Sequence, residues 1–168
     1  MIDRERNFWF KRTHVPFLDK EVTMKLPEYV SVSEVKRVCR ELTIRDWTKL
    51  KEPKVLPQEA QVILDEVNTE GMNIDLEEFR TGLEVELEHG VRFKDANVTN
   101  NHPVLTGKIV VAHLKESLDY YKLLEVAELE GDLLKAIVAK DLKKIKAKYK
   151  KLAEAKIALS KAEAKQVE

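Results

Sequence analysis

Glycine, proline and cysteine are all scarce in this sequence. Its 168 residues contain five glycines, five prolines and the single cysteine Cys39. Glycine and proline interrupt helices, and 43% of the residues are hydrophobic while 36% are charged, so the composition favours a helical fold with a buried core. A lone cysteine cannot form a disulfide within the chain, which suits a reducing compartment.

Long apolar runs are also missing. No stretch approaches the roughly 20 apolar residues that a membrane-spanning helix needs. The segment from Met1 to Arg12 is charged throughout, unlike a signal peptide. We therefore expect no membrane anchor, and a location in the cytoplasm or inside a particle that is assembled there.

The formal net charge of zero conceals three regions of different charge. Residues 1–56 carry 13 basic and 9 acidic side chains, residues 57–131 carry 6 and 16, and residues 132–168 carry 11 and 5. Basic ends on either side of an acidic middle attract that middle, within one chain or between neighbouring chains.

Residues 1–30 show no regular period and are expected to form an extended arm. Phe8, Trp9 and Phe10 lie among arginines and lysines in this segment. Aromatic side chains alternating with basic ones can bind single-stranded nucleic acid by stacking and charge. Because the sequence contains no recognised nucleic-acid-binding motif, we favour contact of these three aromatics with a protein partner or with the chain's own core.

Residues 31–131 are predicted to form a compact helical domain. A first helix spans Ser31 to Thr43 with Ser33 as its N-cap, and a second begins at Pro57 and ends at Val67. Apolar residues recur at steps of three and four, which places them on one face of each helix. The predicted buried residues are Val35, Val38, Cys39 and Leu42 in the first helix, and Ala60, Ile63, Leu64 and Val67 in the second.

Two longer helices are predicted at the centre of this domain. Asp75 is the expected N-cap of the first, and Gly90 is expected to end it in the left-handed conformation that glycine tolerates. Pro103 begins the second. The candidate caps before it are Asn100, Asn101 and His102, with asparagine the better cap. The apolar face of the first is Leu76, Phe79, Leu83 and Leu87, and that of the second is Val104, Ile109, Ala112, Leu114 and Leu118, continued by Tyr120, Tyr121, Leu124 and Ala127.

Four residues of these helices form a candidate metal site, namely Glu86, His89, His113 and Glu116. They stand in a Glu-x-x-His and a His-x-x-Glu pattern, so each pair shares one helix face. Glu-x-x-His motifs hold metal in di-iron helical bundles, and this set suits zinc, iron or manganese. The alternative is hydrogen bonding at a helix end and between helices, without a cofactor. No catalytic residue is predicted, because no nucleophilic set stands out.

Residues 132–168 are predicted to form a long lysine-rich helix with a seam of coiled-coil type. The seam consists of Leu134, Val138, Leu142, Ile145, Tyr149, Leu152 and Leu159. A lone helix cannot bury such a seam, so a protein partner or a second copy is expected to contact it. The candidate partner-binding residues are Leu142, Ile145, Tyr149, Leu152 and Leu159. Nucleic acid is a less favoured partner, because an apolar seam has no use against phosphates.

Motifs between residues 57 and 130 carry a family resemblance. They include Glu77-Glu78-Phe79, Val85-Glu86-Leu87-Glu88-His89-Gly90, Asn97-Val98-Thr99, Thr106-Gly107-Lys108-Ile109, Ala112-His113-Leu114 and Asp119-Tyr120-Tyr121. In these motifs the chain resembles an uncharacterised family of short bacterial, archaeal and phage proteins known only as a domain of unknown function. Asn101-His102 stand where that family usually has two acids, which disfavours a hard cation at this loop. Ser117-Leu118 replace its usual Phe-Pro pair.

These observations predict an all-α protein with an N-terminal arm, a compact helical domain and a long C-terminal helix. The resemblance implies no activity, and we expect a non-enzymatic structural or accessory subunit of a larger assembly. The occurrence of the family in phages suggests a virion or capsid-associated protein. The alternative is a metal-binding helical protein or a small metal-dependent enzyme that uses the Glu/His cluster.

Overall fold

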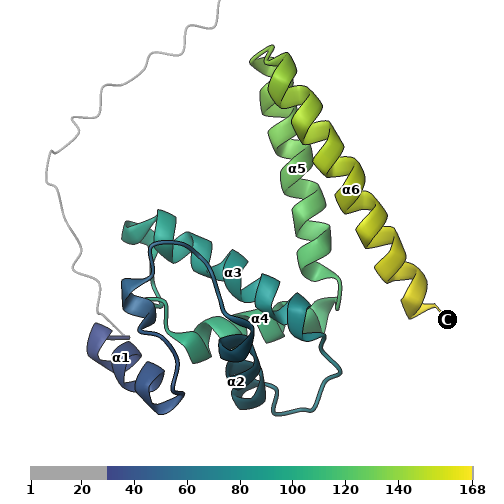
Figure 1. Ribbon diagram of the computed structural model, residues 1–168. Coiled ribbons are helices and arrows are strands. Elements are labelled where there is room, and N and C mark those ends of the chain that lie inside the picture. Colours follow the sequence, from purple (N-terminus) through teal and green to yellow (C-terminus); the bar gives the residue numbers. More distant parts are fainter. Residues whose placement is uncertain (1–29, 168) are drawn as a thin grey trace, which may run out of the picture.

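The computed structural model describes residues 30–167, and their regular elements are all helical (Figure 1). These residues contain no strand, so the predicted all-α class is confirmed. Their six α-helices are α1 (Val32–Glu41), α2 (Pro57–Val67), α3 (Leu76–Arg92), α4 (Pro103–Glu116), α5 (Tyr120–Val138) and α6 (Leu142–Gln166). Short 3-10 turns occur at Trp47–Lys49 and Lys94–Ala96. Across residues 30–167, none of the helices combines the length and the apolar character needed to cross a membrane.

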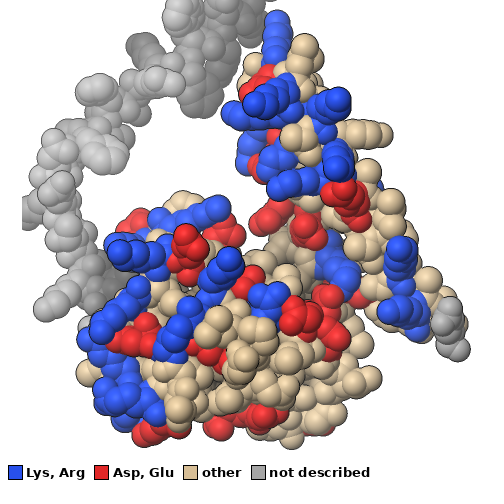
Figure 2. Space-filling view, in the orientation of Figure 1, with Lys and Arg blue, Asp and Glu red and all other residues tan. Residues whose placement is uncertain are grey.

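One hydrophobic core joins α1 to α4 and the start of α5. Its largest fully buried side chains include Trp47, Ile63, Phe79, Leu83 and Leu87. Burial of each such side chain contributes roughly 1.5–3 kcal/mol, so this core holds most of the stability of the domain. Charged side chains cover much of its outside (Figure 2).

The first two helices follow the predicted pattern, with one change of cap. The hydroxyl of Ser31 accepts a hydrogen bond from the backbone N–H of Glu34 at 3.2 Å, so Ser31 and not Ser33 is the N-cap of α1. The bounds of α2 match the prediction, and the predicted inner faces of both helices are buried or partly buried.

The start of α3 agrees with the prediction, but its end does not. Asp75 accepts hydrogen bonds from the backbone N–H groups of Glu77 and Glu78 at 2.9 and 3.1 Å. The helix then continues through Gly90 to Arg92. Gly90 has no positive φ, so its predicted role as the left-handed end of the helix is wrong.

A close contact explains the glycine at position 90. A β-carbon there would overlap Asn101 Oδ1 and would lie 2.9 Å from the side chain of Asn97. Asn97 Nδ2 donates to the carbonyl of Gly90 at 3.3 Å. The glycine therefore lets the connection between α3 and α4 lie against α3.

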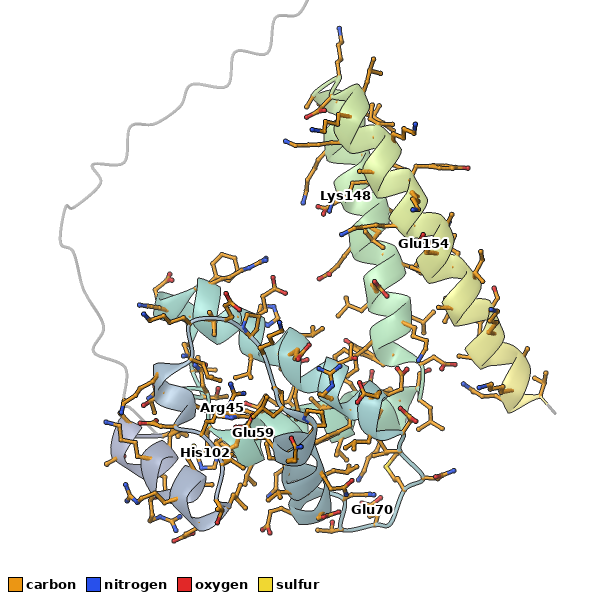
Figure 3. All side chains as sticks on the ribbon, viewed as in Figure 1. Arg45, Glu59, Glu70, His102, Lys148 and Glu154 are labelled. Carbon is orange, nitrogen blue, oxygen red and sulfur yellow. The ribbon has the colours of Figure 1, made fainter. Side chains whose placement is uncertain are left out.

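The cap of α4 is a histidine. His102 Nδ1 accepts from the backbone N–H of Leu105 at 3.3 Å (Figure 3). Burial lowers the pKa of His102, which keeps the ring neutral and able to accept. Asn100 and Asn101 have φ values of 50° and 60°, whereas an N-cap needs an extended backbone. The preference for an asparagine cap is therefore wrong.

The buried face of α4 also differs from the prediction. Its buried residues are Pro103, Thr106, Gly107, Val110, Val111 and Leu114, whereas Ile109 and Ala112 are exposed. A β-carbon at Gly107 would lie 2.6 Å from Ile63 Cγ2. The close approach of α4 to α2 at this glycine selects the buried face.

The long helical pattern after Pro103 is interrupted twice. Ser117 has an extended backbone and ends α4. A turn over residues 139–141, with Lys140 at φ 54°, separates α5 from α6. The helix predicted from residue 132 is therefore the end of α5 followed by α6, and these two helices lie side by side as a hairpin that projects from the domain (Figure 1).

The α5–α6 hairpin has a small core of its own. Leu129, Leu152 and Ala155 are buried there, with Val126 and Leu133 packed against them. The polar end of α6 is held at the base of the hairpin, because Gln166 Nε2 donates to Asp119 Oδ2. The seam of α6 is thus covered in part by α5 of the same chain.

Candidate functional site

Two of the predicted metal ligands meet where α3 and α4 pack together. His113, in the last turn of α4, has its Nδ1 atom 3.2 Å from Oε1 of Glu86 on α3. Tyr121, at the start of α5, joins them: its hydroxyl donates to Glu86 Oε1 at 3.0 Å and lies 3.1 Å from His113 Nδ1. These three side chains, the Glu86–His113–Tyr121 cluster, connect three helices.

The position of Tyr121 depends on a glycine. A β-carbon at Gly82 of α3 would lie 2.5 Å from Tyr121 Cε2 and 2.6 Å from Val110 Cγ1. Glycine therefore makes room for the tyrosine ring, which is buried. The ring of His113 stacks on the neighbouring Tyr120, with centroids 4.2 Å apart and planes at 9°.

The hydrogen bonds of the cluster determine its protonation. Burial, followed by the nearby carboxylate of Glu86, raises the pKa of Tyr121, so the phenol keeps its proton and donates it to Glu86. Nδ1 of His113 then faces two oxygens and interacts favourably with them only as an N–H donor. A neutral His113 therefore carries its proton on Nδ1, and its Nε2 is the acceptor nitrogen.

The other two predicted ligands do not complete a metal site. Glu116 is exposed at the end of α4, and His89 lines the groove beside the cluster. Within residues 30–167, no group of three or more His, Cys, Asp and Glu side chains is placed to share one metal ion. Of the predicted set of Glu86, His89, His113 and Glu116, the structure brings Glu86 and His113 together, and Tyr121 bonds to Glu86.

Protein purified without chelator is expected to contain no near-stoichiometric zinc, iron or manganese by elemental analysis. Adding these metals should leave the melting temperature unchanged, because only a ligand that binds the folded state raises it. Co-purified metal that is lost in His113→Ala would contradict this expectation.

A groove of ≈ 570 Å³ lies between α3 and α5 beside the cluster. Its lining includes Glu86, Glu88, His89, Phe93, Tyr120 and Asp132. Several of its charges are paired locally, since Glu88 bonds to Arg92 and Asp132 bonds to Lys135 and Lys148 at 3.3 and 2.6 Å. Of these pairs, Asp132–Lys148 joins α5 to α6, whereas the other two each lie within one helix.

The predicted partner-binding residues fall into three groups. Phe8, Trp9 and Phe10 lie outside the described residues. Leu142 and Tyr149 of α6 are 80% and 66% exposed. Ile145 and Leu159 are partly buried, and Leu152 is only 7% exposed because it packs on α5. Leu152 is therefore not available at the surface of the folded hairpin. The sequence pattern did not reveal this, because periodicity alone does not show that α5 covers this side chain.

Sequence reasoning also missed two side chains that matter here. Tyr121 was expected only in the apolar core, although its hydroxyl completes the cluster. Ile137 was not selected at all, and it is exposed on α5. The available signal was the repeated interval of seven residues, from Leu123 to Glu130 and from Glu130 to Ile137.

Comparison with known proteins identifies a family that matches the region from α1 into α5. A family model described as "Protein of unknown function (DUF5661)" matches residues 35–130. The match begins within α1, earlier than the resemblance at residue 57, and ends within α5, so it omits α6. No curated protein and no solved structure matches the chain. Because the matched region covers more than half of the 168 residues, the chain belongs to this DUF5661 family.

Proposed function

We propose that the protein is a non-enzymatic accessory subunit that joins a larger assembly through its α5–α6 hairpin. The exposure of Leu142 and Tyr149 on a projecting hairpin is the observation that carries this proposal. Large apolar side chains exposed together on a surface are typical of sites that bind other proteins.

The small core of the hairpin supports this role. Leu129, Leu152 and Ala155 pack within the hairpin and apart from the core of the domain. A hairpin with its own core keeps its shape away from the domain, as an element that reaches a partner must.

The charge of the hairpin indicates the kind of partner. Lysines gather at its free end, where α5 turns into α6 (Figure 2). Apolar side chains among lysines suit a protein surface that is both apolar and acidic. A virion or capsid-associated assembly is the specific case that the resemblance to phage proteins suggests.

A photo-crosslinking amino acid at position 142 tests the proposal in the organism that makes the protein. Val98 is the matched control, because it is 85% exposed on the domain, far along the chain from the hairpin. We expect position 142 to give one discrete crosslinked protein product that position 98 does not give. The same products from both positions, or none from position 142, would contradict a docking role for the hairpin.

A further inference from the structure

Exposed side chains form two rows along the α5–α6 hairpin, each with an interval of seven residues. The rows are Leu123, Glu130 and Ile137 on α5, and Leu142, Tyr149 and Lys156 on α6. Seven residues make nearly two helical turns, so each row runs along one face of its helix. The four apolar members of the rows are all exposed.

The two rows lie on the same side of the hairpin. Glu130 and Lys156, the charged members of the rows, form an ion pair of 2.7 Å across the two helices. Asp132 and Lys148 form another cross-hairpin pair of 2.6 Å. Since Asp132 is two residues from Glu130, about 200° around α5, this second pair lies on the opposite side. We call the side with both rows the outer face.

The outer face is large enough for a stable protein interface. The 25 residues of α6 extend about 37 Å at 1.5 Å per residue, and two adjacent helices are about 20 Å wide. Such a face has roughly 700 Å², close to the roughly 800 Å² that each partner buries in a standard interface. The rows follow the length of the hairpin, which is the shape that a second pair of helices covers in a four-helix bundle.

The distribution of charge along the chain favours a second copy whose hairpin runs in the opposite direction. Residues 132–150, at the free end, carry seven lysines and two aspartates, whereas residues 57–131 carry 6 basic and 16 acidic side chains. Two hairpins packed in the same direction would bring both lysine-rich ends together. Packed in opposite directions, each lysine-rich end lies near the acidic domain of the other copy.

We propose that two copies of this chain pack outer face to outer face, in opposite directions, into a four-helix bundle. The inference rests on the proposed function, because it names the partner of the same hairpin. The bundle covers Leu123, Ile137, Leu142 and Tyr149 of each copy. The charged members of the rows, Glu130 and Lys156, already pair within one chain, so covering them leaves neither charge unpaired.

The mass in solution of the full chain, measured over a wide range of concentration, tests this dimer. We expect a dimer whose dissociation constant rises at least about tenfold in Tyr149→Glu, because the new charge would be buried at the interface. Ala147→Glu is the matched control: Ala147 is exposed, and it lies two residues, about 200°, from Tyr149 on α6. It should leave the dissociation constant unchanged.

If Tyr149→Glu and Ala147→Glu raise the dissociation constant of the dimer equally, and both variants melt like the wild type, the outer face is not the interface. A wild-type chain that stays monomeric overturns the second copy as partner. If position 142 still crosslinks to another protein in that case, the proposed function stands without the dimer. If it does not, both proposals fail.

Engineered cysteines test the direction of packing. Lys146 and Ser160 lie on the same side of α6 as Tyr149, and Cys39 is buried and does not interfere. Within one copy the two positions are about 21 Å apart, too far for a disulfide. Mixing Lys146→Cys with Ser160→Cys should give mostly the mixed disulfide under mild oxidation. Preferential pairing of Lys146→Cys with itself overturns the opposite direction.

Discussion

Replacing Glu59 by alanine is expected to lower the free energy of unfolding by about 3 kcal/mol. Glu59 lies in the first turn of α2, and its side chain is 4% exposed. Its Oε1 accepts from the backbone N–H and the Nε of Arg45 at 3.0 and 2.8 Å. Its Oε2 accepts from an outer guanidinium nitrogen of Arg45 at 2.6 Å and from the backbone N–H of Leu56 at 3.0 Å.

The loss of Glu59 would leave several donors without an acceptor. Figure 3 shows Arg45 and Glu59 beside each other, where the segment after α1 meets the start of α2. Each buried donor left unpaired costs about 1–3 kcal/mol. Arg45 is 41% exposed and regains water when the partner is removed, which keeps the expected loss at the lower end of the range for buried ion pairs.

Urea unfolding measures this effect, and Glu34→Ala is the control. Glu34 also binds an arginine, Arg37, at 2.5 Å, but on the open surface of α1. Exposed ion pairs contribute little, so this variant should unfold at nearly the wild-type urea concentration. Similar losses in the two variants would show that burial of the Arg45–Glu59 pair is not what stabilises this part of the fold.

The same pair makes stability depend on pH. Burial raises the pKa of Glu59, but its hydrogen bonds with Arg45 and Leu56 outweigh burial and lower the pKa overall. A carboxylate with a lowered pKa in the folded state stabilises the fold above its ordinary pKa of about 4.3 and loses that contribution as the pH falls. Below that pH the difference in stability between wild type and Glu59→Gln should therefore shrink. A stability difference that stays constant as the pH falls would contradict the lowered pKa of Glu59.

Replacing Gly82 by alanine is expected to destabilise the protein by about 1–3 kcal/mol. The new β-carbon would lie within 2.6 Å of both the Tyr121 ring and Val110, and neither neighbour is the flexible end of a long side chain. Relief of the overlap requires α3 to move from α4 and α5, which also loosens the hydrogen bond from Tyr121 to Glu86.

Gly131→Ala is the control for Gly82→Ala. Gly131 lies within α5, and a β-carbon there would meet no atom within 4 Å. Alanine in a helix is favoured over glycine by roughly 0.5–1 kcal/mol, so this variant should be more stable than the wild type. The two substitutions are chemically identical, and melting temperatures that shift in the same direction would contradict the packing described at Gly82.

Local chemistry in the sequence determined where α2, α3 and α4 begin. Pro57 and Pro103 mark the first residues of α2 and α4, and Asp75 caps α3. A cap or a first-turn proline acts on backbone groups only a few residues away, so it can be recognised without the rest of the fold. The inner faces of α1 and α2 were predictable for a similar reason, since each presents its apolar stripe to a single core.

Only the tertiary structure decided which neighbour each helix has. Gly90 was expected to end α3, yet its role is to admit Asn97 and Asn101 from a later loop. The same limit applies to the candidate site, where Glu86 and His113 were predicted as a set with two residues that do not join them. Tyr121 completes the cluster because Gly82 lets α5 approach α3, a contact between residues far apart in the chain.

The α5–α6 hairpin shows most clearly what the sequence predicted and what only the fold decided. Steps of three and four predicted an apolar seam on α6, and Leu152 is buried in it. The turn at residues 139–141 was not predicted. This turn folds α6 back on α5 and leaves Leu142 and Tyr149 exposed. Periodicity specifies which side chains share a face of a helix, but the surface that covers this face depends on contacts that only the folded chain makes.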